Sequence, residues 1–309
     1  VKVFYSDHFV LPLPEGHRFP MKKYSMLRER VERNGICGPG ELRTPHAVTD
    51  EEIFRAHDPD YLERVVAGTL TAKQMRKIGF PWSQRMVERS RQASGGTLDA
   101  ARVALSEGIA ANLAGGTHHA FAGRGEGFCV LNDSAIAARA LLAEGLVEKV
   151  VVLDTDVHQG NGTAAILCED PRVFTLSIHG EKNYPFHKEE SDLDVPLPDG
   201  AGDGVFLAAL VEALERVLDL EEWDLALFLA GADPFEGDKL GRLSVTKSGL
   251  AERDRVVLEG CRERGLPVAV TMAGGYARQV EDTVDIHFQT IKRASNLLRA
   301  ERDATHGRL

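Results

Sequence analysis

Short apolar segments alternate with segments of helical periodicity along this chain, and this alternation limits the fold more than any other feature of the sequence. Residues 150–153, 172–178, 225–230 and 268–272 are each short, largely apolar and often β-branched. Such segments are typical of parallel strands that are buried on both faces. Apolar residues recur at helical spacing over 94–107, 133–144, 206–218 and 250–264. This alternation predicts an α/β protein with a parallel sheet and helices on both of its faces.

The composition is that of a globular protein with a large core. Of the 309 residues, 43% are hydrophobic and 27% are charged, so the chain can bury a core without disulfides or a structural metal. Any metal is therefore predicted to be catalytic. No composition change marks a linker and no internal repeat is found, so residues 1–309 are predicted to form one domain. A helix near 283–298 is expected to pack on the body, and the tail after about residue 300 is expected to fray.

Charge and cysteine content restrict the partners and the compartment. The chain has 47 acidic and 37 basic residues and a formal net charge of −10, which argues against binding to nucleic acid or to an anionic membrane. The four cysteines form no CxxC pair, as is typical of a reducing compartment. The first residues show no signal-peptide pattern, and no apolar run approaches the length of a membrane span. A cytoplasmic protein without a membrane partner is therefore expected.

Polar and glycine residues gather where the predicted strands end. Asp154, Ser177, Gly231 and Gly274 lie at or just past the C-terminal ends of four predicted strands. In open α/β sheets, ligands bind at this edge. We therefore expect the functional site there.

Acidic residues and a histidine follow the first of these strands. Asp154, Asp156 and His158 are spaced two residues apart, so their side chains can point to the same side. Two carboxylates and an imidazole are a ligand pattern for Zn²⁺ or a similar divalent ion. Asp233, fixed before a proline after another strand, can add a third protein ligand and leave positions open for water and substrate. The structural alternative is that these residues only cap helices and form turns.

Two further segments carry groups suited to catalysis. His118 and His119 follow a glycine pair, so one can act as a general base while the other holds charge. Tyr276 follows two glycines at a strand end, where its hydroxyl can reach a substrate oxygen as an oxyanion donor. The structural alternatives are a pair of ordinary surface histidines and an aromatic lid over the sheet edge.

A glycine and an aromatic residue lie in another loop. Gly127 and Phe128 can form one wall of an apolar slot, or they can simply pack within the loop. Cys129, which follows them, is expected to be a buried apolar residue rather than a nucleophile.

These five segments occur in one order along the chain. They read THHA at 117–120, GEGFCVLND at 125–133, DTDVHQGNG at 154–162, AGADP at 230–234 and AGGY at 273–276. Smaller matches are HDPDYL at 57–62, LSIH at 176–179 and FEGDKLGRLS at 235–244. The ordered set resembles the histone deacetylase superfamily from about residue 17 to residue 290, and the last stretch is most similar to class IV-like and bacterial histone deacetylase-like amidohydrolases. The resemblance implies the arginase–deacetylase fold, a parallel eight-stranded sheet flanked by helices.

The resemblance also implies a role for each motif residue. Zn²⁺ would be bound by Asp156, His158 and Asp233, a set that also accepts Fe²⁺. The catalytic residues would be His118, His119 and Tyr276. A monovalent cation, usually K⁺, would be bound by Asp154, Asp156, His158, Ser177 and Ile178, several through backbone carbonyls. The acyl-lysine tunnel would be lined by Gly127, Phe128, Tyr184, Phe186, Gly274 and Gly275.

The implied activity is zinc-dependent hydrolysis of the amide of acyl-lysine, with acetyl as the default acyl group and longer chains allowed. The substrate would be an acylated lysine peptide or protein, and an acylated polyamine or another small molecule is the first alternative. The second alternative is a pseudoenzyme that binds acyl ligands without turnover, although every catalytic and zinc-binding residue is present. The arginase-type branch is disfavoured because a further carboxylate-rich run for a second bridged metal is missing.

Asn161 departs from many relatives, which carry Asp at this position. The resemblance pairs Asp154 with His118, and Asn161 with His119. A neutral amide stabilises a protonated imidazole less than a carboxylate does. Asn161 is therefore expected to leave His119 less basic than an Asp would, without implying an inactive enzyme.

Overall fold

The apolar segments of the sequence form the middle of one sheet. The computed structural model describes the backbone of residues 1–306 and the side chains of residues 1–300. The strands lie in the order β2-β1-β3-β8-β7-β4-β5-β6, and all neighbours run parallel. They are β1 (Lys2–Phe4), β2 (Leu42–Arg43), β3 (Ile109–Asn112), β4 (Val150–Asp154), β5 (Val173–Gly180), β6 (Leu193–Leu197), β7 (Leu225–Leu229) and β8 (Val268–Thr271). This eight-stranded sheet confirms the predicted parallel α/β architecture.

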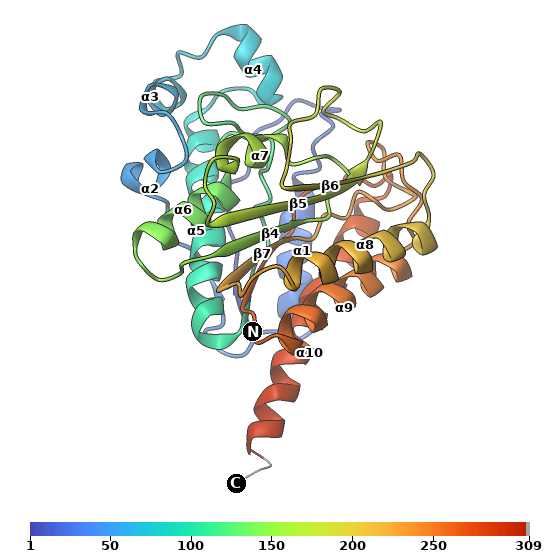
Figure 1. The fold of residues 1–309 in the computed structure, drawn as a ribbon. Coiled ribbons are helices and arrows are strands. Elements are labelled where there is room, and N and C mark those ends of the chain that lie inside the picture. The colour runs from blue at the N-terminus through green and yellow to red at the C-terminus, as the bar shows by residue number, and fades with distance from the viewer. Residues whose placement is uncertain (307–309) are drawn as a thin grey trace.

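Helices cover both faces of the sheet (Figure 1). One face carries α1 (Lys22–Arg33), α8 (Asp203–Leu218), α9 (Lys247–Glu263) and α10 (Val280–His306). The other face carries α5 (Gln84–Glu107), α6 (Asp133–Ala143) and α7 (Asn161–Leu167), with the shorter α2 (Asp50–Phe54), α3 (Pro59–Ala67) and α4 (Ala72–Ile78) beside them. Among these helices, none combines the length and the apolarity that crossing a bilayer needs.

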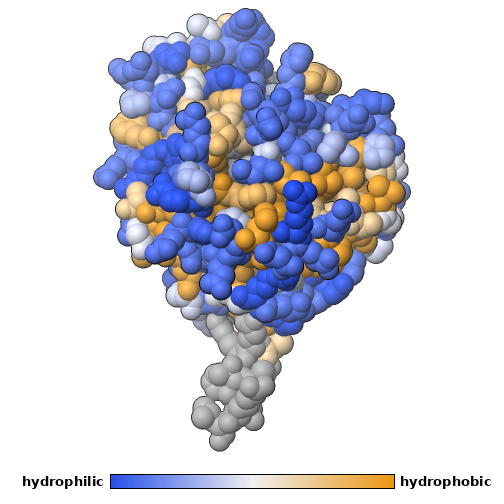
Figure 2. All heavy atoms as spheres, viewed as in Figure 1, coloured by the Kyte–Doolittle hydropathy of each residue, from blue (hydrophilic) through white to orange (hydrophobic). Residues whose placement is uncertain are grey.

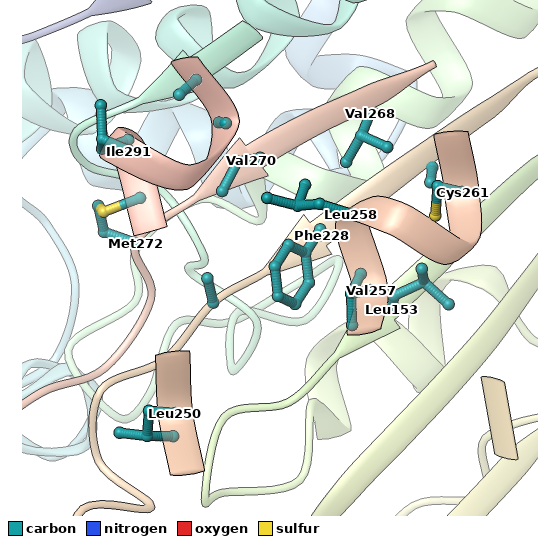
Figure 3. Close-up of a cluster of buried hydrophobic side chains, with 14 of the residues drawn as sticks. Leu153, Phe228, Leu250, Val257, Leu258, Cys261, Val268, Val270, Met272 and Ile291 are labelled. Carbon is teal, nitrogen blue, oxygen red and sulfur yellow. The ribbon is translucent and has the colours of Figure 1, made fainter. Parts of the chain in front are cut away.

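The central strands β4 and β7 are apolar up to their C-terminal ends because each of their faces meets a helical layer. In β4, Val150 and Val152 belong to one core, whereas Val151 and Leu153 belong to the other. Figure 3 shows the second core around Phe228 of β7, which is packed against side chains of α9 and β8. This two-sided burial explains why these segments lack the polar–apolar alternation of a half-exposed strand.

Two helices differ most from the sequence-based expectation in length. α5 begins at Gln84 rather than at residue 94, because Ser83 caps it by accepting a hydrogen bond from the backbone N–H of Met86 (3.1 Å). α10 extends on both sides of the predicted 283–298 and continues past residue 300 to His306. The last part of the tail, residues 307–309, lies outside the described residues.

The face of the molecule drawn in Figure 2 is mostly hydrophilic, with hydrophobic side chains gathered around β6 and α8. β6 is the last strand of the sheet. It contains Pro196, which has no backbone N–H to offer to a strand of another chain. The fold therefore protects this edge against unwanted pairing.

Candidate active site

Parallel pairing brings the ends of the central strands to one edge of the sheet. Asp154, the last residue of β4, lies in register with Ser177 of β5 and Leu229 of β7. The loops that follow these strands are joined by buried hydrogen bonds. The backbone N–H of Val157 donates to Asp233 Oδ1 (2.9 Å), and that of Gly274 donates to Asp156 Oδ2 (2.7 Å). The polar residues that the sequence places after separate strands thus lie together.

Asp156, His158 and Asp233 form a buried cluster with the donor set of a metal site. One ligand atom from each residue lies within 4.8 Å of the others. His158 Nδ1 is 3.0 Å from Asp156 Oδ1 and 3.2 Å from Asp233 Oδ2. The Asp233 Oδ2 atom is buried and accepts no hydrogen bond. A buried acceptor without a donor is costly, and a divalent cation would satisfy it. Two carboxylates and one imidazole therefore fit a zinc-type ion.

The electrostatics of this cluster favour bound positive charge. Burial raises the pKa of Asp233 to about 7, and the neighbouring charge of Asp156 adds to this shift. Burial alone would lower the pKa of His158, but its hydrogen bond to Asp156 and the negative charges of Asp233 and Asp156 outweigh this effect and raise that pKa to about 10. A cluster that holds a proton this firmly has the negative charge to hold a cation in its place.

The loop after β8 approaches the cluster closely at a glycine. A Cβ atom on Gly274 would lie 1.9 Å from Asp233 Oδ2 and 2.6 Å from Asp156 Oδ2. No other residue can occupy this position without moving a metal-site carboxylate. Gly274 therefore belongs to the floor of the site.

His118 is held in the protonated form by its carboxylate neighbours. Its Nδ1 donates to Asp154 Oδ2 at 2.6 Å. Burial lowers the pKa of His118, but the charges of Asp154 and Asp156 and this hydrogen bond together raise it to about 9. His118 therefore carries positive charge at neutral pH.

His119 has the opposite character although it is the next residue. Asn161 Nδ2 donates to Glu126 Oε1 (3.3 Å), which turns Asn161 Oδ1 toward His119 to accept from its Nδ1 (2.7 Å). The amide orientation thereby leaves Nε2 of His119 as the free acceptor. Burial holds the pKa of His119 well below its usual value, and the positive charges of His118 and His158 add to this effect. His119 is therefore neutral at neutral pH and suited to accept a proton.

Tyr276 is positioned by contacts to its backbone. Its N–H donates to Asp238 Oδ2 (2.6 Å), and the buried Lys23 of α1 donates to the carbonyls of Ala273 (3.2 Å) and Gly275 (3.4 Å). Burial raises the pKa of Tyr276 well above its usual value, with a further contribution from the nearby carboxylates. Tyr276 therefore keeps its proton and can donate a hydrogen bond.

The walls leading to these residues are aromatic. Gly127 has φ +58°, and a Cβ there would lie 2.5 Å from His119 Cδ2, so only glycine lets this loop approach the histidine. The Phe128 ring lies 5.9 Å from that of Tyr276, and the Tyr184 ring lies 5.0 Å from that of His119. Phe186 is 82% exposed and lies at the outer mouth.

Gly275, Cys129 and the cation-site residues complete the predicted set. Gly275 directs its carbonyl to Lys23. Cys129 is buried, and burial raises the pKa of its thiol, which is unsuited to a nucleophile. Ser177 and Ile178 lie on β5 in the buried interior, and Ser177 pairs with Asp154 across the strands. The monovalent-cation site stays a prediction.

Several positioning residues carry no role in the sequence-based analysis. The carboxylate of Asp133 accepts from the N–H groups of Gly116 (2.9 Å) and Thr117 (2.7 Å) and holds the loop of the two histidines. Lys23 and Asp238 hold the tyrosine loop, and Glu126 orients Asn161. Glu126 and Asp238 lie inside the family motifs, so the sequence could have singled them out as candidate site residues. Lys23 lies far from these motifs in the sequence, and no sequence pattern marks it as a site residue.

Comparison with known proteins places this chain in a family. The model of the histone deacetylase domain matches residues 17–291. The chain belongs to the histone deacetylase family. It is 44% identical to an uncharacterized protein of Picosynechococcus sp., covering 97% of this chain and 98% of that protein. It is 27% identical to histone deacetylase 2 of Arabidopsis thaliana, covering 92% and 78%.

The fold of this histone deacetylase family member agrees with that of solved relatives. A crystal structure of an HDAC homolog from Aquifex aeolicus superposes with a TM-score of 0.82 at 25% identity, covering 96% of this chain and 84% of that one. The predicted arginase–deacetylase fold and the bacterial histone deacetylase-like assignment are thereby confirmed. Family membership supports an amidohydrolase of the deacetylase type.

Proposed function

We propose that this protein is a zinc-dependent amidohydrolase that releases the acyl group of acyl-lysine, with acetyl as the default group. The observation that carries the proposal is the meeting of three elements at one sheet edge. These are the Asp156–His158–Asp233 donor set, a neutral histidine with a free Nε2, and a protonated tyrosine. Metal, base and oxyanion donor are the components that metal-assisted amide hydrolysis requires.

Asp156, His158 and Asp233 would hold the zinc ion, and the same donors accept Fe²⁺. When bound, the ion supplies Lewis acidity that makes a water more acidic and polarises the substrate carbonyl. A monovalent cation such as K⁺ is proposed beside it, with Asp154, Asp156, His158, Ser177 and Ile178 as its ligands. The β4–β5 register, which sets Ser177 beside Asp154, supports this second site.

The two histidines divide the proton transfers. His119 Nε2 takes a proton from the attacking water and returns it to the leaving amine as the amide C–N bond breaks. His118, held positive by Asp154, stabilises the negative charge that develops nearby. The Tyr276 hydroxyl donates a hydrogen bond to the oxyanion that forms on the amide carbonyl oxygen. The products are a free amine and a carboxylate.

Turnover of acylated peptides tests this proposal directly. Zinc-loaded protein is incubated with acyl-lysine peptides from acetyl to myristoyl and with an acetylated polyamine, and release of amine is measured. Hydrolysis of a lysine peptide, lost in Tyr276→Phe, is the expected result. A folded, metal-loaded protein that cleaves none of these substrates would contradict the proposed activity and favour an acyl-binding protein.

Exchange of Asn161 for Asp is expected to move the acidic limb of the pH–rate profile upward. The added carboxylate favours the protonated form of His119 and raises its pKa. Because the neutral histidine is the active base, activity is lost as the pH falls through this pKa, and a raised pKa places that loss at higher pH. The measurement is kcat/KM against pH for both proteins.

A second variant is needed because the carboxylate introduced by Asn161→Asp would face Glu126, which lies 3.3 Å from the present amide. Two carboxylates at that distance share a proton, and this sharing reduces the rise in the pKa of His119. Asn161→Asp combined with Glu126→Gln keeps one carboxylate, and its limb should move further than that of Asn161→Asp alone. Superimposable profiles for all three proteins would refute the assigned pairing of Asn161 with His119.

A further inference from the structure

An open mouth lies outside the catalytic residues, and its charged lining is entirely basic. The mouth extends outward from His119, His158 and Tyr276 past the aromatic walls. Five cationic side chains line it: Arg18, Lys77, Lys182, Lys239 and Arg242. None of the described residues that line it is Asp or Glu. The chain as a whole has 47 acidic and 37 basic residues, so this mouth has the opposite sign to the molecule's average.

These cations come from separate parts of the chain. Arg18 precedes α1, Lys77 lies in the last turn of α4, and Lys182 follows β5. Lys239 and Arg242 lie in the loop after β7. All five are exposed to solvent. The fold therefore brings like charges together around one opening, although their mutual repulsion opposes this arrangement.

Most of this positive charge is not neutralised by the protein. Arg242 pairs with Asp199 (2.7 Å), and Lys77 lies 3.7 Å from Glu126. Arg18, Lys182 and Lys239 have no ion-pair partner among the described residues. Asp199 accepts hydrogen bonds from Arg242, which chiefly lower its pKa, and the charge of Lys182 lowers that pKa further, so Lys182 interacts with this carboxylate from beyond ion-pair distance. A concave opening lined by one sign of charge concentrates ligands of the opposite sign.

The passage below the mouth carries no such charge. Its walls are Gly127, Phe128 and Tyr184, which suit an acyl chain and a lysine stem. Whatever else the substrate carries must remain in the mouth. Selection between acylated amines therefore falls on the groups next to the acylated nitrogen, and the basic side chains face those groups.

We propose that the substrate carries acidic groups beside its acylated amine, which the basic mouth binds through Arg18, Lys182 and Lys239. This inference rests on the proposed hydrolysis of acyl amides and names its substrate class. The carboxylates come either from Asp and Glu that flank an acyl-lysine in a protein segment, or from the α-carboxylate of a free acylated amino acid. An acylated polyamine brings ammonium groups into the mouth and is repelled.

A matched peptide series tests the charge preference. Acetyl-lysine is flanked on both sides by two Asp, two Ala or two Arg, and free Nε-acetyl-lysine and an acetylated polyamine complete the set. With zinc-loaded protein at low ionic strength, kcat/KM for the Asp peptide should exceed that for the Arg peptide by about 10–100-fold. The ratio should shrink in 0.5 M salt, because screening shortens the reach of exposed charges to only about 3–5 Å. The polyamine should be the poorest substrate.

Charge reversal identifies the residues responsible. Combined Arg18→Glu, Lys182→Glu and Lys239→Glu should invert the Asp-to-Arg ratio. The matched control combines Lys73→Glu, Arg85→Glu and Lys292→Glu, which are exposed cations that do not line the mouth. It has the same net charge and should keep the original ratio. Equal effects of the two triple variants would overturn the assignment to the mouth.

The outcomes separate this inference from the proposed function. Similar cleavage of the Asp, Ala and Arg peptides, or preference for the polyamine, overturns the inference and leaves the amidohydrolase intact. If free acetyl-lysine surpasses the Asp peptide, the inference holds with the small molecule as the source of the carboxylate. If no substrate is cleaved, the proposed function fails, and fluorescence anisotropy of the labelled peptides still decides the inference. Tighter binding of the Asp peptide supports it, and equal binding refutes it.

Discussion

Replacement of Tyr276 by Phe should lower kcat on an acyl-lysine peptide by about 10²–10³-fold, the usual effect of losing one oxyanion-hole donor. The phenol is buried and its pKa is raised well above the usual value, so it is a hydrogen-bond donor throughout the working pH range. Because the negative charge on the carbonyl oxygen develops only in the transition state, KM should change much less than kcat. Steady-state kinetics with the preferred acyl peptide measures both constants.

Tyr184→Phe provides the matched control for this experiment. Its ring faces His119 across the passage with a centroid distance of 5.0 Å, so the same atom is removed from a second tyrosine in the same cavity. Its kcat should fall by far less than that of Tyr276→Phe, since the Tyr184 hydroxyl is hydrogen-bonded to Glu126 rather than directed at the oxyanion. A larger loss in Tyr184→Phe than in Tyr276→Phe would show that the wrong tyrosine has been assigned.

The parts of the fold that could be predicted are those whose signal lies within one segment. β4, β7 and β8 are continuous apolar runs because both of their faces are buried, and the predicted ranges agree with the observed ones to within one residue. β1 and β2 are too short to carry a pattern, with three and two residues. β6 is an edge strand that contains an aspartate and a proline, and it has no strand signature of its own.

The site shows the same limit at the level of single side chains. Asp156, His158 and Asp233 could be singled out because metal-ligand chemistry has a recognisable residue pattern. Lys23 could not, because its function is to donate to two backbone carbonyls 250 and 252 residues further along the chain. A lysine in a helix is expected to be exposed at the surface. Only the tertiary structure shows that Lys23 is buried beneath the tyrosine loop.

Removal of the metal should abolish turnover, and Asp233→Asn should prevent its recovery. The purified protein is expected to hold one divalent ion per chain in the proposed Asp156–His158–Asp233 site, since these are its only described group of three clustered ligands. Chelation followed by zinc should restore the activity of the wild type. In Asp233→Asn, one anionic ligand is lost, and both metal content by elemental analysis and activity should fall. Asp170→Asn changes an aspartate that is paired with the exposed Arg172 and should retain its metal.

Thermal unfolding gives this prediction a readout that is independent of turnover. Without metal, burial and then the nearby charge of Asp156 raise the pKa of Asp233, so Asn at 233 removes an unfavourably buried acid and should leave the Tm of the metal-free protein unchanged or higher. Added zinc stabilises only a protein that binds it, by about 2.7 kcal/mol at a concentration one hundred times Kd. The Tm of the wild type should therefore rise with zinc while that of Asp233→Asn stays flat. Equal zinc-induced shifts in the two proteins would place the metal elsewhere, and the catalytic roles of His119 and Tyr276 beside it would fall with that site.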